Sequence, residues 1–205
     1  MTEKFTVYLV DDDSGVLKAL SRLLRAKGHD VKPYSSPQVF LEEHDVAVPG
    51  CVVLDVSMPG LDGLEIQRVL TAASGYHRPV VFVTGKGDIP TSVRAMKAGA
   101  IDFLTKPVKD KDLFEAVSRA EARDAESRRL HSELESMQAK VSNLTPRERE
   151  VLTHVVAGRL NKQIAGDLGT VEKTIKVHRS RMMEKLGIRT VADLVRMAEK
   201  LNLSK

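Results

Sequence analysis

The chain has 205 residues, of which 42% are hydrophobic, enough to bury the core of one large domain or of two modest ones. No run of residues approaches the ~20 consecutive apolar positions of a membrane span. The short apolar start before Asp11 lacks the length and the cleavage site of a secretory leader, so we expect no targeting segment. The single cysteine, Cys51, cannot form an internal disulfide, which fits a reducing cytoplasm. Because Cys51 opens an apolar run, we expect a buried structural thiol rather than a reactive one.

Positive charge is concentrated in the last third of the chain. Residues 145–205 carry thirteen Lys and Arg against seven Asp and Glu, whereas residues 1–121 carry fifteen against seventeen. This asymmetry is typical of a nucleic-acid-binding module joined to a regulatory module, although many solvated helical domains are also modestly basic.

The first 120 residues alternate short β-rich runs with amphipathic segments. Strands are expected at Thr6–Val10, Asp30–Tyr34, Cys51–Leu54, Pro79–Val83 and Ala100–Leu104. Helices are expected at Val16–Arg25, with Ser14 as N-cap and Gly28 as the stop, at Leu61–Leu70 and at Ile89–Ala98. The first, third and fourth strands are almost entirely apolar, as in central parallel strands covered by helices on both faces. The alternation predicts a doubly wound parallel α/β sheet.

Residues capable of chemistry follow four of these strands. The ligand crevice of a doubly wound sheet lies at the carboxyl ends of its strands, where the sequence places Asp11, Asp12, Asp13, Asp55, Thr84 and Lys106. Carboxylates gathered there repel one another unless a cation neutralises them, and Mg²⁺ (or Mn²⁺) suits oxygen ligands of this kind. A carboxylate beside such a metal can attack a phosphoryl group. Lys106 could then pair with the new phosphate, and Thr84 could donate its hydroxyl to it.

A helical stretch without Gly or Pro runs from Asp110 to about Leu144. Its apolar residues step by four, three, four and three at Leu130, Leu134, Met137, Val141 and Leu144, which is heptad spacing. We expect one long helix, or two abutting ones, that joins two domains. The heptad stretch is either a short coiled-coil seam or a face that packs on a domain of its own chain, and the sequence favours neither.

The last sixty residues predict only helices, at about 146–157, 161–168, 171–186 and 190–202. Thr145, Pro146 and Glu148 form a capping-box pattern at the first of them. The remaining N-caps are expected at Asn161, Thr170 and Thr190.

The second and third of these helices have helix-turn-helix spacing, with a turn at Gly169. On the later helix, Ile175, Met182 and Leu186 form an inward face. We expect Lys173, Lys176, Arg179 and Ser180 on the outer surface, where they could reach DNA. His178 is interpreted as a packed or capping histidine rather than a base contact.

Four motifs, in order, resemble the receiver signature of two-component response regulators: Val10–Asp13, Leu54–Gly63, Val83–Gly85 and Phe103–Pro107. The resemblance covers residues 5 to about 120 and implies a flavodoxin-like receiver fold. It implies that Asp55 is the phosphoacceptor. It also implies that Asp12, Asp55 and the Ser57 backbone carbonyl bind Mg²⁺ directly, and that Asp11 does so largely through water. Thr84 and Phe103 would be the switch pair, a hydroxyl that moves toward the phosphate and a ring that turns inward behind it.

Two further stretches refine the resemblance. Gly87–Pro90 and Ala95–Ala100 are similar to the FixJ-like branch of the NarL/FixJ family. Ser57 departs from the bulkier residue common there, which leaves carbonyl ligation intact and bears on the phosphoryl lifetime. Residues 144–200 resemble a LuxR-type domain, which implies a recognition helix at 171–186 in the major groove and a last helix, Val191–Leu201, that pairs two copies on DNA. The expected DNA-binding set is Lys162, Thr170, Lys173, Thr174, Lys176, Val177, Arg179 and Ser180.

The expected organisation is a receiver domain at 1–120, a helical linker at 121–143 and a LuxR-type helix-turn-helix domain at 144–205. Phosphotransfer from a sensor histidine kinase to Asp55 would control homodimerisation and sequence-specific DNA binding, with transcription activated through RNA polymerase, so we expect no enzyme. One alternative is a metal-dependent phosphatase on a similar scaffold, against which the helix-turn-helix argues. Another is an atypical regulator without phosphorylation, against which the intact acidic residues and Lys106 argue.

Overall fold

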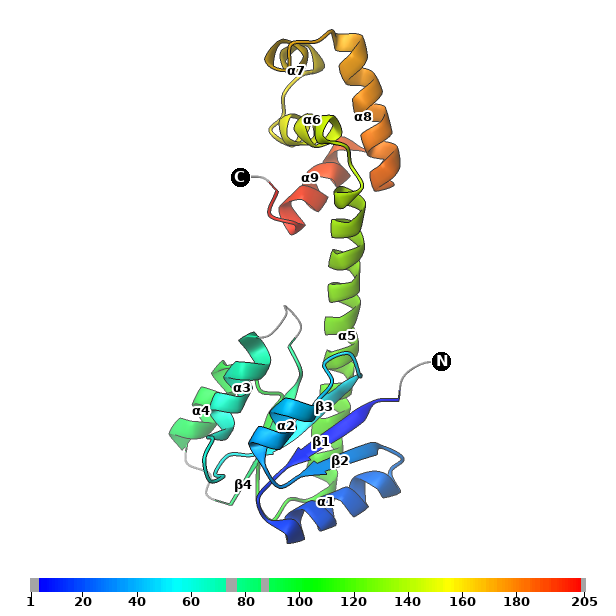
Figure 1. The fold of residues 1–205 in the computed structure, drawn as a ribbon. Helices are drawn as coiled ribbons and strands as arrows, with labels where there is room; N and C mark the ends of the chain where they lie inside the picture. The colour runs from blue at the N-terminus through cyan, green and yellow to red at the C-terminus, as the bar shows by residue number, and fades with distance from the viewer. Residues whose placement is uncertain (1–3, 73–76, 86–88, 204–205) are drawn as a thin grey trace. The chain divides into compact units, whose positions relative to one another are not determined.

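The computed structural model describes residues 4–72, 77–85 and 89–203, and the chain divides into two compact units, residues 1–129 and 130–205. The strands are β1 (Thr6–Val10), β2 (Asp30–Tyr34), β3 (Gly50–Asp55), β4 (Val80–Thr84) and β5 (Asp102–Thr105). The helices are α1 (Ser14–Ala26), α2 (Pro37–Glu43), α3 (Gly63–Ala72), α4 (Ile89–Lys97), α5 (Asp110–Ser142), α6 (Pro146–Val156), α7 (Asn161–Asp167), α8 (Glu172–Leu186) and α9 (Val191–Lys200) (Figure 1). In the described ranges, none of these helices has the length and apolarity needed to span a bilayer.

The five strands of the first unit form one parallel sheet in the order β2-β1-β3-β4-β5. Every residue of β1, β3 and β4 is buried, as the apolar runs of these strands predict. The chain starts in the middle of the sheet and reverses direction between β1 and β3, so these neighbouring strands end side by side at a topological switch point. The predicted doubly wound α/β sheet is confirmed.

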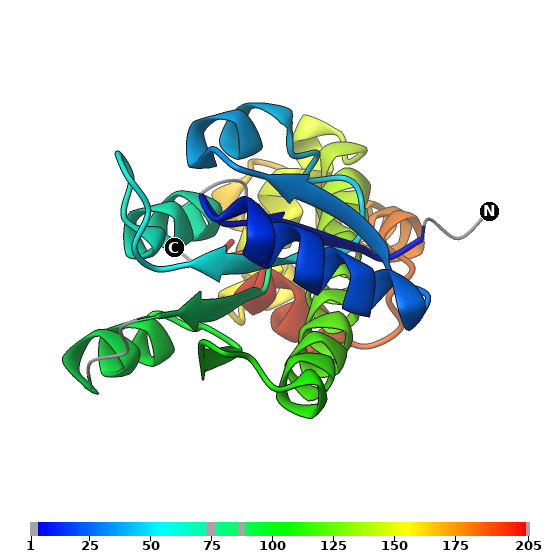
Figure 2. The same cartoon turned by 90° about the horizontal axis from the view of Figure 1, so that it is seen from below.

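Helices cover both faces of the sheet (Figures 1 and 2). On one face, α2, α3 and α4 pack on a core that includes Tyr8, Phe40 and Phe82. On the other face, α1 and the first part of α5 pack on Leu9, Val53 and their neighbours. Cys51 is fully buried in this second layer, as predicted, and burial raises the pKa of its thiol.

Several element boundaries differ from the prediction. The N-cap of α1 is Asp13, whose carboxylate accepts from the N–H groups of Gly15 and Val16, so the expectation for Ser14 was wrong. Helix α3 begins two residues later than predicted, at Gly63. Strand β5 begins at Asp102, because the Ala100 N–H still bonds to the Ala95 carbonyl in the turn that ends α4. Helix α2, which Ser36 caps, was not predicted at all.

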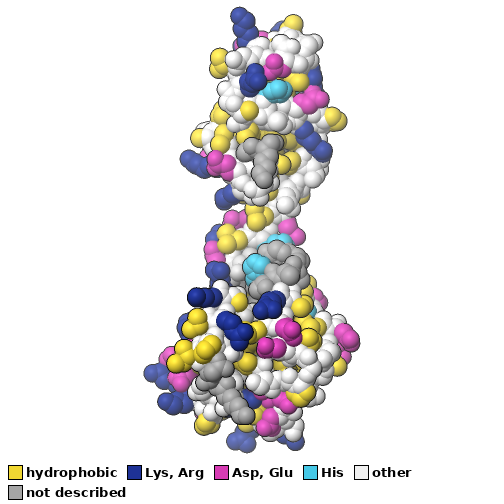
Figure 3. Space-filling view, turned by 90° about the vertical axis from the view of Figure 1, so that its left-hand side faces the viewer, with side chains coloured by type: hydrophobic (Ala, Val, Ile, Leu, Met, Phe, Trp, Pro, Cys, Tyr) yellow, Lys and Arg dark blue, Asp and Glu magenta, His cyan; other side chains and the backbone are white. Residues whose placement is uncertain are grey.

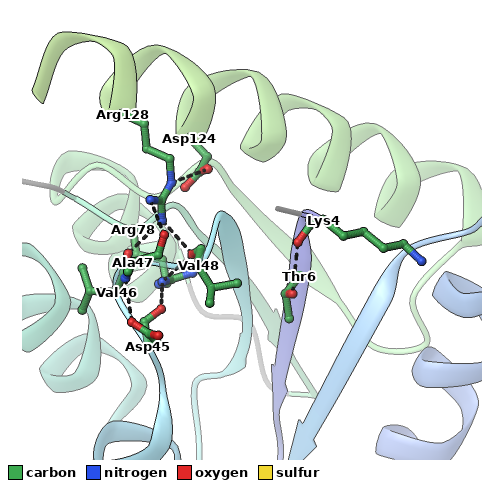
Figure 4. A network of polar contacts seen from close by, with 9 residues as sticks. All are labelled: Lys4, Thr6, Asp45, Val46, Ala47, Val48, Arg78, Asp124 and Arg128. Atoms are coloured by element: carbon green, nitrogen blue, oxygen red, sulfur yellow. Dashed lines mark hydrogen bonds and ion pairs between the residues drawn. The ribbon is translucent and has the colours of Figure 1, made fainter. Parts of the chain in front are cut away.

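The contact of α5 with the first unit extends well past its apolar stretch (Figure 4). After the buried Ala120, the same face of the helix carries Asp124 and Arg128, four and eight residues later. The Arg128 guanidinium pairs with Asp124 and donates to the carbonyl oxygens of residues 46, 47 and 48 at 2.7–2.8 Å. Arg78, itself only 3% exposed, donates to the carbonyls of Asp45 and Val48 from the other side. Two arginines therefore hold the loop that leads into β3, and we call this group the carbonyl clamp.

The second unit is entirely helical over its described residues. Its core gathers Val151, Ile164, Ile175, Met182 and Leu194 from α6, α7, α8 and α9. The Thr145 hydroxyl accepts from the Glu148 N–H, and Glu148 accepts from the Thr145 N–H, which confirms the predicted capping box. The N-caps of α7 and α8 are Leu160 and Val171, so the expectations for Asn161 and Thr170 were wrong, whereas Thr190 caps α9 as predicted.

The heptad stretch of α5 packs on its own chain at its C-terminal end. Leu144 is 3% exposed in the core of the second unit, and Met137 and Val141 pack against that core. Leu130, at the other end of the stretch, is 44% exposed. Of the two interpretations left open by the sequence, packing on the chain's own domain describes the last three positions.

Candidate functional site

The sheet places the ionisable and hydroxyl side chains of the predicted site at one edge, where the carboxyl ends of its strands lie. Asp11 follows β1, Asp55 ends β3, Thr84 ends β4 and Lys106 follows β5. The backbone pairs hold them in register: Val10 lies opposite Leu54, and Thr84 lies opposite Thr105. The separate runs of sequence therefore converge because parallel strands end at the same edge.

Three carboxylates and one ammonium group meet at this edge. One oxygen each of Asp11, Asp12 and Asp55 lies within 4.8 Å of the others. The Lys106 Nζ lies 2.6 Å from Asp11 Oδ2 and 3.0 Å from Asp55 Oδ2. The side chains of Asp11 and Asp55 are only 6% and 8% exposed, whereas Asp12 is exposed. We call Asp11, Asp12, Asp55 and Lys106 the acidic crevice.

Burial and hydrogen bonding oppose each other in this crevice. Burial raises the pKa of Asp11 above its usual range, although the hydrogen bond from Lys106 opposes the rise. Burial would lower the pKa of Lys106, but its hydrogen bonds to Asp11 and Asp55 outweigh that effect and the pKa is raised. Lys106 is therefore held as a cation between the two buried carboxylates.

Backbone groups around the crevice fix the carboxylates. The Asp13 N–H donates to Asp11 Oδ1 at 2.9 Å, and the Ser57 N–H donates to Asp55 Oδ1 at 3.3 Å. Gly63 allows the loop after β3 to fold back, because a Cβ there would lie 2.6 Å from the Asp55 carbonyl oxygen. Gly63 was not among the predicted site residues; its place at the end of the Leu54–Gly63 motif was the available signal.

The donors of the crevice fit a hard divalent cation. The set consists of carboxylate oxygens, with the Ser57 backbone two residues after Asp55, and Mg²⁺ prefers oxygen ligands and retains several waters. Asp12 lies on the solvent side, where such waters would be accommodated. The cluster is thus compatible with Mg²⁺.

The two predicted switch residues lie on neighbouring strands. Thr84 is fully buried at the end of β4, and its carbonyl accepts from the Lys106 N–H at 2.7 Å. Phe103, on β5, is half-buried against the first core, with its ring centroid 6.1 Å from that of Phe82.

Of the segment Gly87–Pro90, residues 87 and 88 lie outside the described residues.

Helices α7 and α8 form the predicted helix-turn-helix. Gly169, in the turn between them, has a φ of +62°, a left-handed conformation that glycine adopts without strain. Ile175, Met182 and Leu186 are buried along one face of α8, as predicted. Of the predicted DNA-binding residues, those exposed are Lys162, Lys173, Lys176, Val177 and Ser180, and those half-buried are Thr170, Thr174 and Arg179.

Arg179 is half-buried, whereas the sequence predicted that it lies on the outer surface. It follows Ile175 by four residues and precedes Met182 by three, which places it beside the buried face of α8. Its Nη1 donates to Asn161 Oδ1, on α7, at 3.1 Å. A charged residue type predicts exposure, but a long side chain can begin near a buried face and still bring its charged end to solvent. The residue type alone therefore did not show that Arg179 lies beside the core. His178 is half-buried, in keeping with its interpretation as a packed residue.

Family models of known proteins match both units of the chain. A family model described as "Response regulator receiver domain" matches residues 7–118, and one described as "Bacterial regulatory proteins, luxR family" matches residues 142–198. Nodulation protein W of Bradyrhizobium diazoefficiens is 41% identical over 98% of this chain and 88% of its own length. Response regulator protein TmoT of Ectopseudomonas mendocina is 43% identical over 97% of this chain and 90% of its own length.

Solved structures of similar proteins cover nearly the whole chain. The response regulator StyR is 45% identical, with a TM-score of 0.79 over 96% of this chain and 99% of its own. Full-length FixJ from B. japonicum is 36% identical, with a TM-score of 0.58 over 98% of this chain and 99% of its own. The chain therefore belongs to the two-component response regulators that join a receiver domain to a LuxR-type helix-turn-helix DNA-binding domain.

Proposed function

We propose that Asp55 accepts a phosphoryl group from a sensor histidine kinase and thereby controls dimerisation and sequence-specific DNA binding. The observation that carries this proposal is the geometry of the acidic crevice: Asp55 lies beside Asp11 and Asp12, with the Lys106 Nζ 3.0 Å from its carboxylate. A receiver domain implies a histidine kinase as partner, and a helix-turn-helix implies DNA. As in the family, the chain acts as a regulator rather than an enzyme.

The metal in this proposal is Mg²⁺ or Mn²⁺, held by Asp11, Asp12, Asp55 and the Ser57 carbonyl. When bound, it would neutralise the charge that collects on the carboxylates and on the incoming phosphate. An Asp55 oxygen attacks phosphorus, the bond from phosphorus to the kinase histidine breaks, and the phosphoryl group remains on Asp55 as an acyl phosphate. Lys106 follows the new negative charge and leaves Asp11 for a phosphate oxygen.

The switch would run from the crevice to the surface of α4 and β5. The Thr84 hydroxyl bonds to the phosphate, and Phe103 moves into the space behind it. Helix α4 carries Ile89, Val93 and Met96, which are 80%, 44% and 46% exposed. Figure 3 shows the face of the first unit that carries α3 and α4, where hydrophobic side chains lie among basic ones. This is the surface on which two receiver domains would pair.

Pairing would raise DNA affinity by bringing two binding units together. Once the DNA-binding domain of one protomer is bound, that of its partner meets its half-site at a high effective concentration. No new DNA contact is therefore required. The exposed outer side of α8, with Lys173, Lys176 and Val177, would enter the major groove, and α9 would pair the two units. Bound in this way, the dimer would contact RNA polymerase and activate transcription.

Domain boundaries are part of the same proposal. We place the receiver domain at 1–120, the linker at 121–143 and the DNA-binding domain at 144–205. The carbonyl clamp supports an attachment of the first linker residues, up to Arg128, to the receiver domain. Cys51 remains a buried thiol in a cytoplasmic protein of this kind.

The test replaces Asp55 with Asn and compares dimerisation and DNA binding with and without a small-molecule phosphodonor and Mg²⁺. In the wild type, the donor should produce dimers and tighten binding to a two-fold symmetric operator. The Asp55→Asn protein should bind DNA at the basal level, with or without the donor. Equal stimulation of both proteins would exclude Asp55 as the switch.

A further inference from the structure

Asn161 has a side chain that the helix cap does not use. The sequence favours Asn161 as the N-cap of α7, but the cap is Leu160, whose N–H donates to Gln163 Oε1 at 2.8 Å. Because Asn161 is the first residue of α7 and not its cap, its amide is left to bond elsewhere. It does so across the motif, where Asn161 Oδ1 accepts from the Arg179 Nη1 at 3.1 Å.

Arg179 is an unusual residue for the inner side of a recognition helix. It stands in line with Ile175 and Met182, both of which are 0% exposed, so its stem runs along the interface between α7 and α8. A guanidinium group has five N–H donors in a fixed fork. Asn161 is the partner found for it among the described residues, and the guanidinium is not closed off from solvent. The remaining donors are therefore available to a ligand.

The position of this guanidinium selects the ligand. In a helix-turn-helix, the outer side of the second helix faces the base edges and the first helix crosses the sugar–phosphate backbone. A group bridging the two helices at the rim lies against the backbone rather than deep in the groove. Phosphate oxygens match the arginine fork, and Lys162, exposed on α7 next to Asn161, adds positive charge at this rim.

We propose that Asn161 is a positioning residue that holds Arg179 for contact with a DNA phosphate, and that Arg179 is a backbone contact rather than a base reader. The inference rests on the proposed DNA binding and refines it. The Asn161 carbonyl oxygen fixes one edge of the guanidinium, so less side-chain freedom is lost when the other edge meets the phosphate. Recognition of bases is left to the exposed side of α8.

A double-mutant cycle on the full-length chain tests the inference. Affinity is measured for the operator and for a duplex of unrelated sequence, across a salt series. Arg179→Ala should weaken both by about tenfold and reduce the slope of log affinity against log salt by about one. Asn161→Ala should weaken both by roughly threefold to fivefold. In the Arg179→Ala background, Asn161→Ala should have no further effect, because its target is gone.

Two companion variants separate positioning from other roles. Asn161→Gln keeps an uncharged amide oxygen that can reach Arg179 and should recover part of the affinity lost in Asn161→Ala. Lys162→Ala, one residue away, should weaken binding by itself and add fully to Arg179→Ala. Circular dichroism at the assay temperature checks that each variant is folded.

Three results would overturn the inference. Additive effects of Asn161→Ala and Arg179→Ala would show that Asn161 does not act through Arg179. A loss confined to the operator, with altered base preference, would make Arg179 a base reader. A loss that only tracks the unfolded fraction would make the pair structural. Because the cycle is measured on the unphosphorylated protein, it remains decisive even if Asp55 proves not to be the switch.

Discussion

Lys106 lies closer to Asp11 than to Asp55, with Nζ 2.6 Å from Asp11 Oδ2 and 3.0 Å from Asp55 Oδ2. Its charge is therefore shared between a predicted metal ligand and the predicted phosphoacceptor. A phosphoryl group on Asp55 offers a stronger partner than a carboxylate, and a divalent cation offers the carboxylates a stronger partner than lysine. The ammonium group is placed to exchange one partner for the other.

Replacing Lys106 with Met should therefore tighten Mg²⁺ binding. The ammonium group and the metal neutralise the same carboxylates, so removing the ammonium group removes a competitor and should lower the Mg²⁺ Kd by about threefold or more. Isothermal titration calorimetry of the unphosphorylated chain measures this. The matched control is Lys109→Met, an exposed lysine three residues away, which should leave the Kd unchanged. Weaker metal binding in Lys106→Met would contradict the competition.

A charge on α4 should block dimerisation without blocking phosphorylation. Val93→Glu introduces a carboxylate into the apolar patch formed with Ile89 and Met96, and should weaken phosphodonor-induced dimers by at least about tenfold. Analytical ultracentrifugation measures the dimer, and a phosphate-affinity gel measures phosphorylation. Val39→Glu is the control, since Val39 on α2 is 41% exposed against 44% for Val93. Normal dimers in Val93→Glu, or equal loss in both variants, would remove α4 from the proposed interface.

The carbonyl clamp should contribute measurably to the stability of the receiver domain. Arg128→Ala removes three hydrogen bonds to the loop before β3 and the guanidinium beside Asp124, which is 2% exposed. We expect a loss of about 2 kcal/mol in the free energy of unfolding, given that Arg128 is partly exposed. Arg129→Ala should cost less than about 0.5 kcal/mol, because Arg129 pairs on the surface of its own helix. Urea denaturation compares them, and equal losses would refute the clamp.

The DNA-binding domain should lose stability in acid through Glu148. Hydrogen bonds from Lys185 and from the Thr145 N–H hold the pKa of this nearly buried carboxyl below its usual range. A lowered folded-state pKa adds stability above the unfolded value, about 4.3, and that stability disappears as the pH falls through the folded value. Glu148→Gln should therefore cost about 1–2 kcal/mol at pH 7, and the difference from wild type should close below about pH 4.

Thermal or urea unfolding of the second unit, followed by helical circular dichroism over pH 3–7, measures this difference. Glu150→Gln serves as the control, since Glu150 is about half exposed and pairs with Arg147 on the surface of the same helix. A gap between wild type and Glu148→Gln that stays constant down to pH 3 would show that the carboxyl charge is not its source.

The positions of the strands and the acidic crevice could be predicted because each rests on a strong, local signal. Apolar runs of four or five residues are typical of buried parallel strands, and the rule that such strands end at one edge brings Asp11, Asp55 and Lys106 together without further information. The predicted and observed strands differ by at most two residues at either end.

What could not be predicted depends on contacts between distant residues. Arg128 and the carbonyl groups of residues 46–48 are some eighty positions apart, and backbone carbonyls leave no mark in the sequence. Asn161 has a side chain typical of N-caps, but the cap of α7 is Leu160, and the Asn161 amide oxygen accepts from Arg179 instead. Helix α2 escaped prediction because its seven residues are too few to show a helical period.

The most direct test of the phosphorylation account is to locate the phosphoryl group on the intact chain. After treatment with a phosphodonor and Mg²⁺, reduction with borohydride converts an aspartyl phosphate to homoserine, which mass spectrometry of the digested protein identifies by position. We expect homoserine at position 55, formed only when donor and Mg²⁺ are both present, and none at positions 11 and 12. Reduction products at another carboxylate, or none at all while the donor still stimulates DNA binding, would contradict the account.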